Sequence, residues 1–308
     1  MKRAIRSGAI PAVLAVLLGG LPGQGEGLQK PAQPDVAERL VAEMLAAEQR
    51  LRSVRIELST ASHFPGDTDI VTAGTLHVLR GEQPKRRVAV RMEFGNGLVA
   101  TMDSVETDGG VTIYKDDPAF GEVFLRVPPA IVTDLRWAGE VLDRSDLPGM
   151  RDARADAPLG SALLDGLRRE FALAPSERAE RGGERGTWLA GKRRPGIGEA
   201  DAELPLADRV ELFVRASDHA LLEVKQFRGD EVILAIDVAA LVVDADIPET
   251  TWRLDGRGQT LREIEKYVPL WSQIQDVIRQ AERKLAPADA PEGAEPPPES
   301  LRPSKRGK

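Results

Sequence analysis

Residues 88–97 read Val-Ala-Val-Arg-Met-Glu-Phe-Gly-Asn-Gly, and this stretch decides the fold class of the chain. Apolar residues alternate here with small or charged ones, the apolar set being Val88, Val90, Met92 and Phe94. This period is typical of a strand that buries one face. The Asn-Gly pair supplies the positive φ angles of a tight hairpin. The stretch therefore predicts an antiparallel sheet with one apolar face.

The same alternation recurs on both sides of this stretch. Upstream, Val54, Ile56 and Leu58 alternate with polar residues, and residues 71–79 read as a second strand. Downstream, the turn residues Asp-Gly-Gly precede a strand at 111–114, and a further strand is expected at 120–127. Residues 54–127 thus predict a continuous antiparallel meander of about six strands.

The pattern returns in the second half of the chain. Strands are expected at 210–215, 221–227 and 232–238, with a last short one at 250–254. Helical spacing of apolar residues predicts helices over four segments, 36–52, 131–142, 159–173 and 260–285. Segments 143–158 and 175–205 are rich in Gly, Pro, Asp and Arg, which predicts loops with one short strand at 187–189.

A sheet of about ten strands with one apolar face has to curl and to cover that face. The expected fold is therefore α+β: a strongly curved antiparallel sheet, or half-barrel, covered by lid helices. The space between sheet and helices holds either a ligand or only side chains. An ordinary core shows the same alternation, so both readings stay open at this point.

The two ends of the chain differ in composition from the middle. Basic residues followed by a short apolar run predict a secretory signal peptide, and the Pro-, Glu- and Ala-rich end predicts disorder. The expected organisation is a signal peptide at 1–25, a leader at 26–34, a half-barrel domain at 35–256 with a helical insertion at 128–205, a C-terminal helix at 257–285 and a disordered tail at 286–308.

Composition excludes several classes of function. The chain has 308 residues and no cysteine, so disulfides, Cys-based zinc sites, thiol nucleophiles and Fe–S clusters are ruled out. A net charge of −7 and only 4% aromatic residues argue against nucleic acid as a partner. With its leader, the chain reads as a soluble exported protein of a bacterial periplasm.

The sequence offers no catalytic constellation. The three histidines, His63, His77 and His219, have no partner at metal-ligand spacing, and neither a G-x-S-x-G elbow nor a P-loop is present. Gly256-Arg257-Gly258 lacks the strand and helix that surround a dinucleotide site. The basic run 192–194 fits either an anionic headgroup or a solvated loop. We expect no enzyme activity, no metal and no cofactor.

Three motifs in order carry a resemblance to a known family. Residues 74–80, Gly-Thr-Leu-His-Val-Leu-Arg, precede Pro84 and a pair of arginines, and residues 105–114 form a V-x-T-D-G-G hairpin. Asp237 is followed by Ile-Pro-Glu-Thr-Thr-Trp at 247–252. With the order of elements over residues 36–256, the chain resembles a divergent member of the outer-membrane lipoprotein carrier (LolA-like) superfamily. Its long insertion and C-terminal extension depart from the family pattern.

The resemblance implies a carrier that binds acyl chains on the apolar face of the half-barrel. It implies, as candidate ligand-binding residues, Ile56, Leu58, Val88, Val90, Met92, Leu212, Val214, Val224, Leu234 and Ile236. Leu163, Leu164 and Phe171 would belong to the lid, and Arg80 matches an arginine that gates the lid. The implied partners are an acylated lipoprotein or lipid, an inner-membrane donor and an outer-membrane acceptor. An envelope-stress regulatory module of the same fold, and a structural protein with a filled core, remain alternatives.

Overall fold

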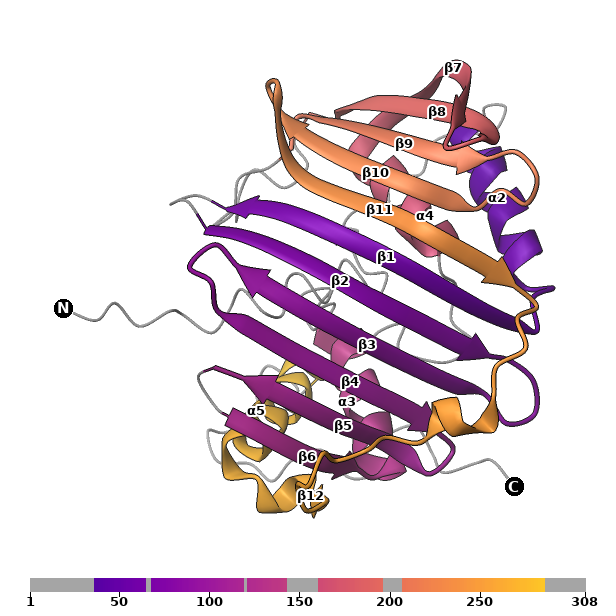
Figure 1. The fold of residues 1–308 in the computed structure, drawn as a ribbon. Helices are drawn as coiled ribbons and strands as arrows, with labels where there is room; N and C mark the ends of the chain where they lie inside the picture. Colours follow the sequence, from indigo (N-terminus) through magenta and orange to yellow (C-terminus); the bar gives the residue numbers. More distant parts are fainter. Residues whose placement is uncertain (1–35, 65–67, 119–120, 143–159, 196–206, 286–308) are drawn as a thin grey trace.

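The computed structural model of the protein describes residues 36–64, 68–118, 121–142, 160–195 and 207–285. The expected signal peptide, leader and C-terminal tail lie outside the described residues, as do the loop expected at 143–158 and part of the one at 175–205. Element labels follow Figure 1.

The first half of the chain forms the predicted meander. Its six strands pair in sequence, each antiparallel to the next. They are β1 (Ser53–Phe64), β2 (Thr68–Leu79), β3 (Lys85–Phe94), β4 (Val99–Thr107), β5 (Gly110–Asp117) and β6 (Gly121–Val127). The alternation seen in the sequence follows from this pairing, because each strand places every second side chain on the same face.

The second half extends the same sheet from its other side. β11 pairs with β1, so the two halves join into one sheet of twelve strands in the order β12-β6-β5-β4-β3-β2-β1-β11-β10-β9-β8-β7 (Figure 1). The added strands are β7 (Phe171–Arg181), β8 (Glu184–Arg193), β9 (Arg209–Arg215), β10 (Leu221–Arg228), β11 (Glu231–Val243) and β12 (Arg262–Glu263).

The described helices lie on one face of this sheet as two pairs (Figure 1). α2 (Val36–Glu48) packs with α4 (Gly160–Glu170), and α3 (Pro129–Leu142) packs with α5 (Val268–Leu285). Short 3-10 turns, η1 (Glu249–Trp252) and η2 (Ile264–Lys266), precede α5. The expected α+β fold, a curved antiparallel sheet with helices on its apolar face, is confirmed.

Two segments differ from the sequence-based expectation. Residues 171–193 form the hairpin β7–β8, whereas a helix through 173 and loops were expected. Gly182 and Gly183, both at positive φ, make its turn, and a register shift between Pro175 and Glu177 interrupts the alternation. The helical insertion at 128–205 was therefore wrong in its second part, since α4 ends at Glu170 and Phe171 begins a strand.

The expected strand at 250–254 is instead the 3-10 turn η1. Residues 257–263, expected as the start of the C-terminal helix, form no helix. They form a turn and then β12, which pairs with β6 in parallel at the edge of the sheet. Gly256 and Gly258 disfavour helix there, and Pro269 fits the first turn of α5, where a missing N–H costs nothing. The helix therefore begins at Val268.

Gly74, in the middle of β2, marks the closest packing within the central strands. It stands opposite Leu58 on β1 and Val90 on β3. A Cβ at this position would lie 2.8 Å from the Val90 Cγ1 atom and 2.8 Å from the Ala89 carbonyl oxygen. Because one of these contacts is backbone, the neighbouring strand cannot give way, and only glycine fits.

We expect Gly74→Ala to lower the free energy of unfolding by about 1–3 kcal/mol, the usual range for overpacking. Gly109→Ala is the control, because the added Cβ there meets only ordinary contacts at 3.5 and 3.7 Å. Urea denaturation of both variants measures the difference. Equal midpoints for the two variants would contradict the packing argument.

Candidate functional site

The sheet has two chemically different faces. Leu58, Gly74, Val90 and Met102 stand opposite one another on β1–β4 and share the side on which the helices lie, here called the helix face. An ion pair between Arg136 of α3 and Glu106 of β4 fixes this orientation, because Glu106 points to the same side as Met102. The other side, which bears Glu57 and Asp103, is here called the open face.

Side chains fill the helix face over β7–β11. Five predicted ligand-binding residues lie there, and the three predicted lid residues of α4 and β7 pack in the same cluster. Leu164, Phe171 and Leu212 are fully buried. The structure thus brings together Leu212, Val214, Val224, Leu234 and Ile236 with Leu163, Leu164 and Phe171. Their contacts are those of a packed core, and their role in binding stays a prediction.

A second cluster forms at the other end of the sheet. α3 and α5 cover β5 and β6 there, with Leu125, Leu135, Ile264 and Ile274 buried at its centre. Each helix pair therefore builds its own core over one end of the sheet.

Between the two helix pairs lies a central strip of aliphatic side chains on β1–β3. Its members are 1–8% exposed and are Val54, Ile56, Leu76, Val78, Val88 and Val90, with Leu51, Leu58, Met102, Val238 and Leu241 packed against them. Apart from Leu51, these described members all come from strands. Four predicted ligand-binding residues belong to this strip, and the fifth on these strands, Met92, is buried on the same face of β3.

Arg80, the predicted gate, connects the meander to the helix pair α2–α4. Its guanidinium donates a hydrogen bond to the Glu48 carbonyl oxygen at the end of α2. The Glu48 carboxylate in turn accepts hydrogen bonds from the Ser161 backbone N–H, at 3.0 Å, and from its hydroxyl, at the start of α4. A carboxylate at a helix N-terminus satisfies donors that the helix leaves free. Arg80 thus helps to hold this helix pair, and a gating role stays a prediction.

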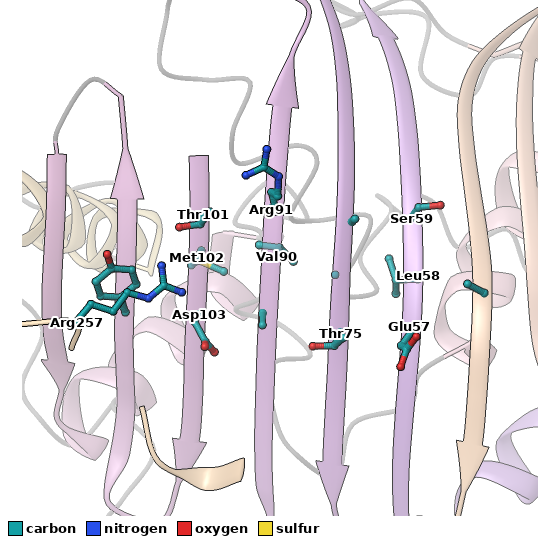
Figure 2. Close-up of a pocket in the computed structure, with 15 residues that line it drawn as sticks. Glu57, Leu58, Ser59, Thr75, Val90, Arg91, Thr101, Met102, Asp103 and Arg257 are labelled. Atoms are coloured by element: carbon teal, nitrogen blue, oxygen red, sulfur yellow. The ribbon is translucent and has the colours of Figure 1, made fainter. Parts of the chain in front are cut away.

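The open face carries a pocket of about 540 Å³ across β1–β5 (Figure 2). Side chains on its floor are small, among them Ser59, Ala73, Thr75 and Ala89. The rim residues are larger: Tyr114 is polar, and the remaining ones carry charge, namely Glu57, Arg91, Asp103 and Arg257. The pocket is therefore a trough with an apolar floor and a polar rim.

One wall of this pocket comes from the segment that follows β11. This segment, residues 244–263, here called the C-terminal strap, crosses the open face and reaches the outer edge of β6 (Figure 1). Arg87 donates to the Thr251 carbonyl oxygen at 2.9 Å, and Lys85 pairs with Glu249 at 2.7 Å. Trp252 is buried beneath the strap's 3-10 turn. These contacts fix the strap on the sheet.

Most charged side chains of the open face neutralise one another. Arg87 makes a bidentate pair with Asp103 through Nε at 3.0 Å and Nη2 at 2.6 Å. Arg55 pairs with Glu57 at 2.7 Å, and Arg91 pairs with Glu93 at 2.8 Å. The guanidinium of Arg257 instead lies over the ring of Tyr114, 4.7 Å from its centroid.

Two titratable groups on this face are perturbed. Burial raises the pKa of the Tyr114 hydroxyl, and the nearby Glu122 carboxylate raises it further. Burial lowers the pKa of His77, and the positive charges of Arg87 and Arg55 lower it further. Both shifts favour the neutral side chain on the open face.

Sequence reasoning did not find the open-face pocket. Its floor residues read as a solvent face, and Gly256-Arg257-Gly258 was considered only as a dinucleotide motif. Within the described residues, no group of acidic or histidine side chains could hold a metal ion. In the same part of the chain, no helix combines the length and apolar character needed to cross a membrane.

No protein-family model matches the sequence, and none of the curated proteins matches it. Solved structures that are similar include a LolA superfamily protein from Nitrosomonas europaea, with 9% identity, TM-score 0.26 and coverage of 71% of this chain and 98% of that one. A putative outer membrane lipoprotein-sorting protein domain from Vibrio parahaemolyticus has 9% identity and TM-score 0.28, over 70% and 97%.

The MucA/MucB complex structure from Pseudomonas aeruginosa has 13% identity and TM-score 0.36, over 71% of this chain and 61% of that one. The superfamily that the sequence resembles is thus represented among the similar structures. At these identities the likeness concerns the fold alone.

We expect Arg80→Met to loosen α2 without unfolding the sheet, because it removes a charged donor to the Glu48 carbonyl while keeping the length of the side chain. The expected loss is about 1–2 kcal/mol. Amide hydrogen exchange in α2 measures it, with the exposed Arg50→Met as control. Unchanged exchange in α2 would contradict the assigned contact.

His77 predicts a pH dependence of stability. A folded pKa below the unfolded value of about 6.5 means that stability is present above that pH and is lost as pH falls through the folded pKa. His77→Gln removes this titration, so the variant should lose less stability than the parent below about pH 6.5. Urea midpoints between neutral and mildly acidic pH measure the difference, and identical losses would refute it.

Proposed function

We propose that the protein is a periplasmic carrier that binds the acyl chains of a lipid or lipoprotein on its helix face. The central strip, between the two helix pairs, is the acyl-chain site. The carrying observation is that this strip is aliphatic, shielded from water and composed, in the described residues, of strand side chains and Leu51.

The helix pairs suit such a site because each has its own core. α2 and α4 pack over β7–β11, and α3 and α5 pack over β5 and β6. Separation of the pairs would widen the strip without exposing either core. Arg80 and Glu48 hold the first pair near the strip, which supports a role in controlling its opening.

The energy of an acyl chain explains why a carrier needs a shielded strip. Each buried methylene contributes about 0.8 kcal/mol, so a sixteen-carbon chain gains about 12 kcal/mol on leaving water. An apolar surface supplies this gain, and the strip consists of apolar side chains, with the buried Arg86 beside it opposite Val78. An inner-membrane donor and an outer-membrane acceptor would then exchange the chain with the strip.

The helix face over β7–β11 is a packed core, and we do not place the acyl chain there. Its predicted ligand-binding residues share one buried cluster with Leu163, Leu164 and Phe171, so a chain there would have to displace core side chains. Interiors packed to this density do not admit a chain without cost. We therefore place the acyl chain against Ile56, Leu58, Val88 and Val90.

The test is mass spectrometry of lipid extracts from protein purified without detergent. We expect a stoichiometric acylated species in the parent and at least about tenfold less in Val90→Trp, a loss that corresponds to about 1.4 kcal/mol or more. Val71→Trp is the control, because Val71 is 49% exposed and lies on the open face of the neighbouring strand.

Leu58→Trp repeats the test at a partly buried position, where the added ring disturbs the fold less. Thermal melts establish that each variant is folded. Protein that is reproducibly free of lipid, and that binds no added lipid or lipopeptide, would overturn the carrier proposal. That result would favour the regulatory module or the structural protein of the same fold.

A further inference from the structure

We propose that the open-face pocket is a second binding site, for a small ligand that carries a phosphate or carboxylate group. Arg257 of the C-terminal strap would bind the anionic group, and the floor of small side chains would take the apolar body. This site lies on the opposite face of the sheet from the central strip and does not depend on the acyl-chain proposal.

The shape of the pocket fits a ligand of this kind. Its volume of about 540 Å³ falls within the ordinary range of small-molecule sites. Ala89 of β3 stands opposite Thr75 of β2 in the lining of the pocket, and Ala73 of β2 stands opposite Arg91. Short side chains in the middle of a sheet leave a flat apolar trough that longer neighbours border.

The backbone of the strap places Arg257 at the rim in an unfavourable conformation. Its φ is +50°, a left-handed value that glycine adopts far more easily than arginine. The Asp255 carboxylate accepts the Arg257 backbone N–H at 2.9 Å, and Gln259 N–H bonds back to the Gly256 carbonyl at 2.8 Å. Strain held in place by such a turn is typical of functional positions.

The turn is also fixed to the sheet on both sides of Arg257. A Cβ on Gly256 would lie 2.6 Å from the Phe124 ring, so glycine is needed for this close approach. The Gln259 side chain donates to the Glu122 carboxylate at 3.0 Å. The guanidinium is therefore presented by a rigid turn over the ring of Tyr114, and Figure 2 shows the Arg257 side chain extending toward Met102 and Asp103.

Charge favours an anionic ligand at this point. Asp103, Glu57 and Arg91, the other charged residues that line the pocket, already have ion-pair partners. Among the residues that the structure describes, no ion pair joins the Arg257 guanidinium to a carboxylate. The Arg257 side chain also hydrogen-bonds to Tyr114, and its planar guanidinium has further N–H donors for a phosphate or carboxylate.

The experiment uses the full mature chain and titration calorimetry with three probes. Phenyl phosphate represents a free phosphate ester, dihexanoyl phosphatidic acid represents a lipid headgroup, and phenol supplies an apolar body without the anion. Arg257→Gly is the main variant, because glycine suits the positive φ and should leave thermal stability equal or higher. Arg253→Ala, an exposed arginine of the same strap, is the control for loss of charge.

We expect a phosphate probe to bind the parent and the control with a Kd below about 1 mM, and Arg257→Gly to weaken that binding at least about tenfold. Phenol should bind far more weakly. Tighter binding of phosphatidic acid would identify a headgroup site, and tighter binding of phenyl phosphate a site for free phosphate esters.

Absence of binding by every probe, or binding that Arg257→Gly leaves unchanged, would overturn the proposal. Failure of the acyl-chain site is recognised separately with Val88→Trp, because Val88 belongs to the central strip and does not line the pocket. The same titration on Val88→Trp should therefore give the parent affinity for the phosphate probe.

Discussion

The arrangement of the helices follows from one constraint: the apolar face of a wide sheet has to be covered. Twelve strands spaced about 4.8 Å apart span roughly 50 Å across the sheet. An α-helix with its side chains is about 10–12 Å wide, so two pairs of helices side by side cover about 40–48 Å. Chain connectivity places one pair toward each end, since α3 directly follows β6 and α4 directly precedes β7. The width left over falls on β1–β3, where the central strip lies.

The same constraint explains the close packing of the middle strands. Far from either helix pair, cohesion comes from strand against strand, and Gly74 lets Val90 approach the backbone of β2. Arg80 and Glu48 then connect these strands to the nearer helix pair through one carbonyl and one carboxylate.

The sequence predicts those strands in which buried and exposed side chains alternate, because this pattern can be recognised within a single strand. The alternation in β1–β6 and β9–β11 is clear enough to predict strands, because the helix face of these strands is mainly apolar. The hairpin β7–β8 escaped prediction since the register shift near Pro175 breaks its period. The strap was not predicted for another reason. Its conformation depends on contacts with Arg87, Phe124 and Glu122, which lie far from the strap in the sequence, so the strap's own residues give no pattern that predicts it. Sequence likewise groups the apolar residues of the helix face but does not separate the strip from the packed core.

The C-terminal strap gives the two faces a physical connection. It leaves β11, whose Val238 and Leu241 pack on the central strip, crosses the open face, and continues through β12 and η2 into α5. α5 packs with α3 on the helix face. The turn that presents Arg257 and the helix α5 therefore belong to one continuous segment of the chain. A ligand in the open-face pocket would change the binding of an acyl chain to the central strip only if the ligand's own affinity differed between two positions of the C-terminal strap. Lys85, Arg87 and Glu122 of the sheet hold the strap, and these contacts can supply such a difference.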